Sequence, residues 1–354
     1  MKTNIPPHTV GIDLGDKKHH ICVLDAAGSQ LESRPMANNK EAFARLSRKY
    51  PEARIVMEVG AQSPWISRAF DALGHEVLVA NARKLRAIYQ DDRKSDEADA
   101  EILARMGRFD PKLLHPIHHG SEQSQRHLIV VKQRDNLVRR RANMICSLRF
   151  TVKSLGIRLR SPNSACFAKA CRLAMKQEHS LLLDEIECVL EVIDVISAKI
   201  RELDKRLEEI CEEHYPDTRR LRQIVGVGPV TALTYVLVID DTGRFANSRA
   251  VGAYLGLCPR RDQSGDTDKE LRISKAGNAY LRKLLVSAAQ YIIGPFGQDC
   301  DLRRHGLELA SRGGQKAKKK AVVAVARKLA VLMHHLWSRK ADYQASYNNH
   351  SQAA

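Results

Sequence analysis

Hydrophobic and polar residues follow two distinct patterns over the first hundred positions of the chain. Short apolar runs separated by polar turns predict three successive strands between Val10 and Met36. Helix-like and strand-like patterns then alternate: helices are expected over 39–50 and 64–74 and strands over 53–60 and 75–82. A further helix is expected to begin near Arg83 and to continue, after a polar break at 90–92, through Asp96 and beyond. Three strands followed by this alternation predict a mixed sheet with helices on its faces.

The middle of the chain carries two long helical patterns. Positions 121–156 place apolar residues at helical spacing, opposite a basic face that includes Arg139, Arg140 and Arg141. This face is either a solvated helix surface or a contact for nucleic-acid phosphates. From Leu183 to Ile210 apolar residues recur at steps of three and four, which predicts a long helix or a short coiled coil. Its acidic flanks favour protein pairing, within the chain or, as we expect, between protomers.

The last third is also helical. Gly226 and Gly228 bracket a tight turn in the apolar segment 221–239, which is typical of a helix-hairpin-helix that binds a DNA phosphate, although an ordinary turn between helices also needs glycine. A final helix is expected over 314–337. It opens with the cations Lys316, Lys318, Lys319 and Lys320. Beside an apolar stripe, this run favours a nucleic-acid face over a purely solvated one.

Composition narrows the class of partner. Lys and Arg exceed Asp and Glu by 58 − 41 = 17 charges, so a polyanion is the expected ligand and nucleic acid the leading candidate. No segment has the ~18 uncharged apolar residues of a membrane helix, and no secretion signal opens the chain. The eight cysteines form no CxxC pair, so we expect reduced, mostly buried thiols without structural zinc, and a cytoplasmic location.

Four carboxylates stand out within the predicted sheet domain. Asp13 lies midway along the first strand and Glu58 near the end of the fourth, each among apolar residues. Asp96 and Asp99 project from one face of a helix at i and i+3. A carboxylate among apolar residues needs a partner, and hard oxygen ligands suit Mg²⁺ or Mn²⁺. The alternative for the helical pair is a solvated helix start, because SDEAD is also a good capping sequence.

A serine provides the second candidate for chemistry. Ser264 precedes a glycine on a short polar loop lined by Arg260, Arg261, Arg272 and Lys275, with Arg282 on the helix that follows. Cations around an accessible hydroxyl suit attack on a phosphate, because they stabilise the charge that develops there. Ser-Gly is equally common in ordinary turns.

The acids resemble those of a nuclease fold. Their order, Asp-Glu-Asp-Asp, is similar to that of RNase H-like domains of the RuvC-like type found in Holliday-junction resolvases. Sugar kinases and actin-like ATPases also begin with IDxG, but they require further Gly-rich phosphate loops that this sequence lacks.

Across almost the whole chain, from Val10 to Trp337, the sequence resembles the bridge-RNA-guided insertion-sequence transposases. The motifs are IDLG, MEVG, RKSDEADA, IVGVGPVTA and GLCPRRDQSG with ISKAGNAYLRKLL, in this order. The departures are small: Val59 to Gln62 replace a Thr-Gly-type turn, and Leu257-Cys258 precede Pro259. Neither departure involves a proposed ligand.

This resemblance implies specific roles. Asp13, Glu58, Asp96 and Asp99 would bind the metal, and Ser264 would form a serine–phosphate intermediate with DNA. A structured non-coding guide RNA would pair with donor and target DNA. The acid domain of one protomer and the serine domain of another would build a composite site, in a dimer or, during synapsis, a tetramer. The protein would act in the nucleoid of a prokaryote.

The expected architecture is therefore α/β plus α-helical. A RuvC-like, RNase H-like domain with a mixed sheet spans 8–150, a helical or coiled-coil linker for oligomerisation spans 151–215, and a helical transposase domain with the serine and the hairpin-helix motif spans 216–343. We expect a disordered tail over 344–354. The alternatives are a metal-dependent, structure-specific DNA nuclease in which water attacks, and a non-catalytic nucleic-acid-binding protein whose acids are structural.

Overall fold

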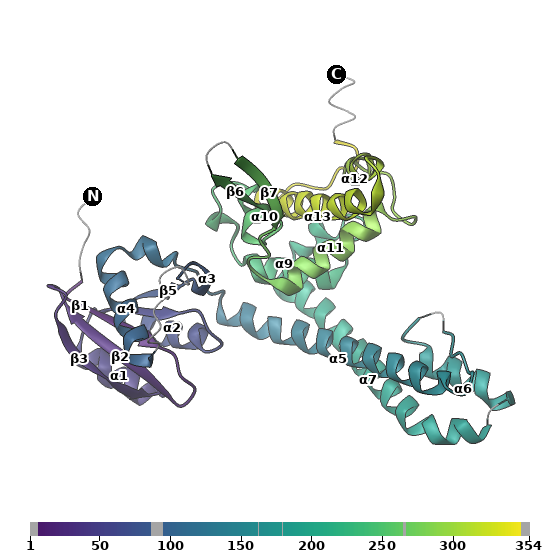
Figure 1. Ribbon diagram of the computed structural model, residues 1–354, viewed down its shortest axis with the longest axis horizontal. Helices are drawn as coiled ribbons and strands as arrows, with labels where there is room; N and C mark the ends of the chain where they lie inside the picture. The colour runs from purple at the N-terminus through teal and green to yellow at the C-terminus, as the bar shows by residue number, and fades with distance from the viewer. Residues whose placement is uncertain (1–5, 86–94, 162, 179, 265–266, 348–354) are drawn as a thin grey trace. The chain divides into compact units, whose positions relative to one another are not determined.

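The computed structural model describes residues 6–85, 95–161, 163–178, 180–264 and 267–347 (Figure 1). It divides into two compact units, Met1–His119 and Gly120–Ala354. No helix among the described residues is long and apolar enough to cross a membrane. All eight cysteines are free thiols. Four of them are buried, so burial is less general than the sequence suggested.

A five-stranded mixed sheet forms the centre of the first unit, with strand order β3-β2-β1-β4-β5. The strands are β1 (His8–Asp13), β2 (Lys18–Asp25), β3 (Gln30–Ala37), β4 (Arg54–Glu58) and β5 (Glu76–Ala80). The first three form an antiparallel meander, whereas β4 runs parallel to β1 and β5 parallel to β4. The predicted mixed sheet is confirmed.

Helices cover both faces of this sheet. They are α1 (Lys40–Lys49), α2 (Ser63–Asp71), α3 (Ala82–Leu85), α4 (Asp96–Phe109) and the 3-10 helix η1 (Pro111–Leu114). Val10 and Ile12 of β1 pack with Phe43 of α1 and Phe70 of α2 in one apolar core. Because side chains alternate along a strand, the residues between them face the other side, where α4 lies.

The second unit begins with a helical hairpin. It contains α5 (Glu122–Lys153), α6 (Phe167–Glu178) and α7 (Ser180–His214), and α7 packs along α5 and α6. Ile186, Leu190 and Ile193 of α7 are buried in a core shared with these two helices. Farther along, Leu207 and Ile210 pack against Val131 of α5. Much of the apolar stripe of α7 is therefore buried within the chain, and pairing between protomers stays a prediction.

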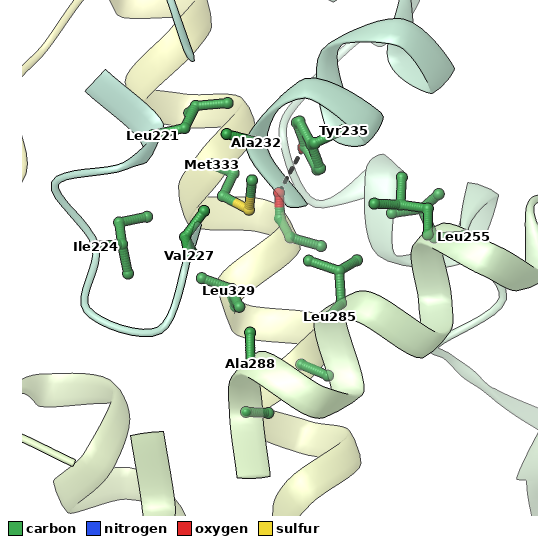
Figure 2. Close-up of a cluster of buried hydrophobic side chains, with 14 of the residues drawn as sticks. Leu221, Ile224, Val227, Ala232, Tyr235, Leu255, Leu285, Ala288, Leu329 and Met333 are labelled. Carbon is green, nitrogen blue, oxygen red and sulfur yellow. Dashed lines mark hydrogen bonds between the residues drawn. The ribbon is translucent and has the colours of Figure 1, made fainter. Parts of the chain in front are cut away.

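The remaining elements pack around a second, larger core. They are α8 (Thr218–Leu221), α9 (Pro229–Ile239), η2 (Thr242–Arg244), α10 (Ala250–Tyr254), the hairpin strands β6 (Pro259–Ser264) and β7 (Thr267–Ile273), α11 (Ala279–Ile293), α12 (Asp301–Ser311) and α13 (Gly314–Arg339). Figure 2 shows this core, in which the hydroxyl of the fully buried Tyr235 donates to the Ala330 carbonyl oxygen at 2.7 Å. Because α9 is apolar on nearly all sides, it is the helix that the others surround.

Two expected boundaries differ in the structure. The first unit ends at His119 rather than near residue 150, because α5 packs against α7 and α9 instead of against the sheet. The expected disorder does not begin at Gln344. Ala345 accepts a hydrogen bond from the Asp301 backbone N–H at 2.8 Å, and Ser346 accepts one from Arg304 at 3.2 Å. Residues 348–354 lie outside the described residues.

Replacing Tyr235 with phenylalanine removes a buried donor without changing the packing shape. We expect Tyr235→Phe to lower the free energy of unfolding by about 1 kcal/mol, the net contribution of one buried hydrogen bond. The half-exposed Tyr291 on α11 offers a matched control, and Tyr291→Phe should stay within about 0.5 kcal/mol. Denaturant unfolding of the full chain measures both. Equal effects of the two substitutions would contradict the packing described for α9.

Candidate active site

Two of the four predicted acids end neighbouring strands. In the parallel pairing of β1 with β4, Gly11 lies opposite Val56 and Ile12 opposite Met57. The next residues along the two strands are Asp13 and Glu58, the last residue of each. Since side chains alternate with a period of two, both carboxylates lie on the face of the sheet that Gly11 and Val56 present to α4. Both are half-buried.

Helix α4 runs antiparallel to β1 across this face. Near its end, the Arg108 guanidinium donates to the Ala26 carbonyl oxygen at 2.6 Å, just past the end of β2, where β1 begins. Farther back along α4, Ala100 lies directly over Gly11, where an added Cβ would stand only 2.0 Å from the Ala100 carbonyl oxygen. The helix backbone therefore rests on the strand at a position that only glycine permits.

The first turn of α4 points toward the end of β1. One turn of helix before Ala100 advances ~6 Å in the direction in which β1 runs, which brings Asp96 and Asp99 to the level of Asp13. Asp99 is half-buried and Asp96 exposed. The Ser95 hydroxyl caps the helix by accepting from the Ala98 N–H at 3.2 Å, so neither acid is needed as the N-cap.

Backbone placement thus brings three elements to one end of the sheet, but the side chains do not complete a metal cage. Among the described parts of the chain, no three His, Cys, Asp or Glu side chains are arranged so that they could hold a metal ion. Asp13, Glu58 and Asp99 each already interact with other groups. Asp13 ends its strand instead of lying midway along it as expected, and the cation assigned to the four acids stays a prediction.

A hydrogen-bonded chain beside these acids was missed by sequence reasoning. His20 of β2 pairs with Asp13 across the antiparallel ladder, so the two side chains share a face. The His20 Nε2 lies 3.0 Å from the Ser33 hydroxyl, which donates to Glu97 of α4 at 3.2 Å. This chain ties the first turn of α4 to β2 and β3. Only the strand register reveals it, because His20 is one of fourteen scattered histidines.

A second missed contact lies just after Glu58. The Ser63 hydroxyl donates to the Gly60 carbonyl oxygen at 2.9 Å and lies 2.9 Å from the His119 Nε2. Burial, with a smaller effect of the Arg68 charge, lowers the pKa of His119. Because the single hydrogen of this hydroxyl is donated to Gly60, a neutral His119 that carries its hydrogen on Nε2 donates to the Ser63 oxygen, which fixes the loop that follows β4.

The predicted nucleophile lies on the two-stranded hairpin of the second unit. Ser264 is the last residue of β6 and pairs with Thr267 of β7, and every residue of β6 is exposed. Arg261 forms an ion pair with Asp268 at 2.8 Å across the hairpin, while Arg260 and Arg272 are exposed. The serine is therefore accessible at the far end of the hairpin, whereas Arg260, Arg261 and Arg272 lie nearer its base, and its role as nucleophile stays a prediction.

The base of the hairpin is anchored through close backbone packing. The Lys275 N–H donates to the Gly256 carbonyl oxygen at 3.1 Å, and a Cβ on Gly256 would stand 2.2 Å from the Ala276 nitrogen. Arg282 donates to the carbonyl oxygens of Leu255 (3.1 Å) and Ala276 (2.6 Å). Arg282, which we assigned to nucleic acid, thus braces this loop with its guanidinium.

The glycine turn and the remaining basic residues have distinct surroundings. Gly226 adopts a left-handed φ of 91° against Tyr291, and Gly228 precedes α9 with open space around it. The helix before this turn, α8, is only one turn long. On α5, Arg139 pairs with Asp135 and Arg141 donates to Ser197 of α7, whereas Arg140 is exposed. Arg140 is thus the most available cation of that trio.

The lysines of α13 occupy an unfavourable position for helix stability. Lys316, Lys318, Lys319 and Lys320 are all exposed in its first two turns. The N-terminus of a helix carries a partial positive charge, so cations there are destabilising by roughly 0.3–1 kcal/mol each. Phosphate groups bound at this end would relieve the repulsion, which supports the predicted nucleic-acid face.

Comparison with known proteins gives matches in both units. Residues 10–156 match a family described as Transposase, whose family name carries the label DEDD. Residues 218–299 match the family described as Transposase IS116/IS110/IS902. The chain is 25% identical to the transposase for insertion sequence element IS1111A of Coxiella burnetii, over 95% of this chain and 91% of the relative.

Further relatives are similar over most of their length. A probable family 20 transposase of Pseudomonas aeruginosa is 25% identical, over 84% of this chain and 87% of the relative. A pilin gene-inverting protein of Moraxella bovis is 23% identical, over 92% of this chain and 94% of the relative.

The contact of α4 with Gly11 gives a testable prediction. Gly11→Ala forces the helix away from β1, and overpacking of this kind destabilises a protein by about 1–3 kcal/mol. Gly60→Ala is the matched control, because the nearest atom to its added Cβ would be 4.0 Å away. Unfolding followed through Trp65, which packs in the first unit's core, measures both variants. A Gly11→Ala protein as stable as Gly60→Ala would contradict the close packing.

Proposed function

Because the chain belongs to the IS116/IS110/IS902 family of transposases, we propose that it cuts and rejoins DNA through a covalent bond between Ser264 and a DNA phosphate. The observation that carries this proposal is the position of Ser264 at the end of an exposed hairpin lined by arginines. A nucleophile that must reach a phosphate on a bulky DNA molecule needs this accessibility.

The covalent step conserves one phosphodiester linkage. The Ser264 Oγ attacks phosphorus and loses its proton, one phosphorus–oxygen bond of the DNA breaks, and the departing sugar oxygen takes up a proton. A hydroxyl group of a second DNA strand then attacks the same phosphorus and loses its proton, a new phosphorus–oxygen bond forms, and the bond to the Ser264 Oγ breaks as that oxygen takes up a proton. Arg260, Arg261 and Arg272 of the same hairpin would stabilise the charge on the phosphate oxygens as the DNA lies along it. The pilin gene-inverting relatives support rejoining rather than simple hydrolysis.

We assign Mg²⁺ or Mn²⁺ to the acidic end of the first unit. Asp13, Glu58 and Asp99 lie at the same end and on the same face of the sheet, and Asp96 stands one turn before Asp99. A divalent cation bound there would neutralise charge on a phosphate. The described side chains form no three-ligand group, so the covalent step above is written for the chain's own residues, and Asp13→Asn tests whether that step also needs the acidic end.

The same proposal includes two kinds of nucleic-acid partner, DNA and RNA. The chain acts on donor and target DNA, and a structured non-coding RNA selects both by base pairing, as in the transposases that the sequence resembles. The excess of 17 positive charges supports more than one nucleic-acid contact. The acids and the serine lie in different units, which supports a composite site assembled in a dimer or tetramer.

A denaturing gel tests the covalent step. The full chain is incubated with the non-coding RNA that flanks its gene, Mg²⁺, and donor and target DNA, and protein–DNA adducts are separated from free DNA. We expect an adduct with the natural chain and none with Ser264→Ala or Asp13→Asn. Ser338→Ala and Asp71→Asn, both at exposed positions, are the matched controls and should form the adduct normally. Omitting the RNA should also abolish the adduct.

Three other outcomes would contradict parts of the proposal. DNA cut without an adduct, and still cut by Ser264→Ala, would identify a metal-dependent nuclease in which water attacks. An adduct that forms equally without RNA would contradict the proposed role of a guide RNA. DNA binding without cutting, unchanged in Asp13→Asn but weakened by lysine replacements, would identify a non-catalytic binding protein.

A further inference from the structure

A deep groove of about 1940 Å³ lies in the second unit, beside the serine hairpin. Helices α12 and α13 line it, together with the inner part of β7 and the C-terminal segment 341–347. Small-molecule sites usually have about 300–1,000 Å³, so this groove has room for a segment of polymer. Apolar side chains contribute much of its lining: Leu257, Leu271, Ile273, Leu309, Val323, Ala324, Val331 and Leu332.

Positive charge dominates the walls of this groove. The described residues that line it include the cations Arg249, Arg272, Lys275, Arg304, Lys319, Lys320, Arg327 and Lys328. Its acids are Glu270, Asp301, Glu308 and Asp342. Three of these acids are already in ion pairs: Asp301 with Arg304 at 2.7 Å, Asp342 with Arg220 at 3.0 Å and Glu308 with Arg312 at 3.8 Å. The field inside the groove therefore attracts an anionic chain.

Cations and apolar residues alternate along one face of α13. Lys320, Ala324, Lys328, Val331 and His335 follow each other at steps of three and four, so they form a line along the helix. Lys320 and Lys328 stand about 12 Å apart, at ~1.5 Å per residue. In this arrangement the two lysines can bind phosphates, and the apolar residues between and beyond them can contact uncharged, flat groups.

The hairpin links the groove to Ser264. Glu270–Ile273 of β7 line the groove, whereas Thr267 at the other end of β7 pairs with Ser264. Four residues of strand separate Thr267 from Leu271, which corresponds to about 13 Å. A nucleic-acid strand whose phosphate is held at Ser264 reaches the groove within a few nucleotides.

We propose that this groove binds single-stranded DNA next to the phosphate that Ser264 attacks. In a duplex the bases are stacked inside, so an apolar protein surface makes few contacts with them. Unpaired bases instead stack on apolar and aromatic side chains, while cations contact the phosphate backbone. The groove combines both features, and Tyr343, Tyr347 and His305 add flat rings to its lining. This inference rests on the proposed attack by Ser264 and adds that the strand is unpaired at the cut.

Binding measurements on the full-length Ser264→Ala chain test the groove without cleavage. The probes are a fluorescent oligothymidylate, a DNA duplex of the same length and an oligouridylate, compared by anisotropy at one salt concentration. Lys328→Glu alters the cationic edge, and Val331→Asp places an acid among the apolar residues. Arg339→Glu makes the same charge change on α13 at an exposed residue outside the groove.

We expect Lys328→Glu and Val331→Asp each to weaken oligothymidylate binding roughly tenfold, the cost of losing about one stacked base or its contacts. Duplex binding should change less than about threefold, as should all binding by Arg339→Glu. An equal loss for duplex and single strand, no loss in either variant, or a tenfold preference for oligouridylate would overturn the proposal. The gel assay separates the two proposals. An adduct without groove-dependent binding would contradict the proposed binding of single-stranded DNA in the groove. Groove-dependent binding without any adduct would contradict the proposed attack by Ser264.

Discussion

The approach of α4 to β1 at Gly11 is the contact on which the acidic site depends. With any side chain at that position, the carbonyl oxygen of Ala100 would be displaced and the helix would tilt or lift from the strand. Because the helix lies flat, its first turn stands level with the ends of β1 and β4, where Asp13 and Glu58 are. The His20–Ser33–Glu97 chain adds a polar brace on the other side of the same turn. Steric fit and hydrogen bonds thus place acids from two strands and one helix together.

Ser264 is positioned by the attachment of its hairpin to the helical core. Its hairpin has no buried face, and a two-stranded hairpin is at best marginally stable by itself. Rigidity comes from its base, where Gly256 and Gly277 allow backbones to touch and Arg282 bridges two loop carbonyls. The reactive end is therefore free to meet DNA while its attachment to the helical core is fixed. An exposed hairpin beside a basic groove is a suitable arrangement for a protein that handles a cut strand.

Much of this arrangement could be predicted from the sequence. The meander of β1 to β3 and the alternation that follows rest on local patterns, and the structure confirms them. The helix expected from Arg83 through Asp96 is described only in α3, which ends at Leu85, and in α4, which begins at Asp96 after its Ser95 cap. The partner of α7 could not be predicted, because an apolar stripe specifies burial but not which helix covers it. The boundary at His119 was missed for the same reason, since the pattern of α5 does not say whether it packs on the sheet or on α7.

The functional details divide in the same way. The four acids and Ser264 were found because of their sequence context, among apolar residues, at a helix start or on a loop with arginines, although Asp13 ends its strand rather than lying at its centre. His20 and the groove were not, since both arise from residues that meet only in three dimensions: His20 through strand register, and the groove through elements between residues 247 and 347. Neither leaves a pattern in any short segment.

Identification of the amino acid that carries the DNA tests the central claim most directly. Trypsin cuts after Arg261 and Lys269, so the peptide 262–269, DQSGDTDK, contains Ser264 as its only serine. Mass spectrometry of the digested protein–DNA adduct, after nuclease treatment, should find the nucleotide on this peptide, with fragment ions that place it on Ser264 rather than on Thr267. A nucleotide found on any other peptide, or no linked peptide while DNA is rejoined, would contradict the account.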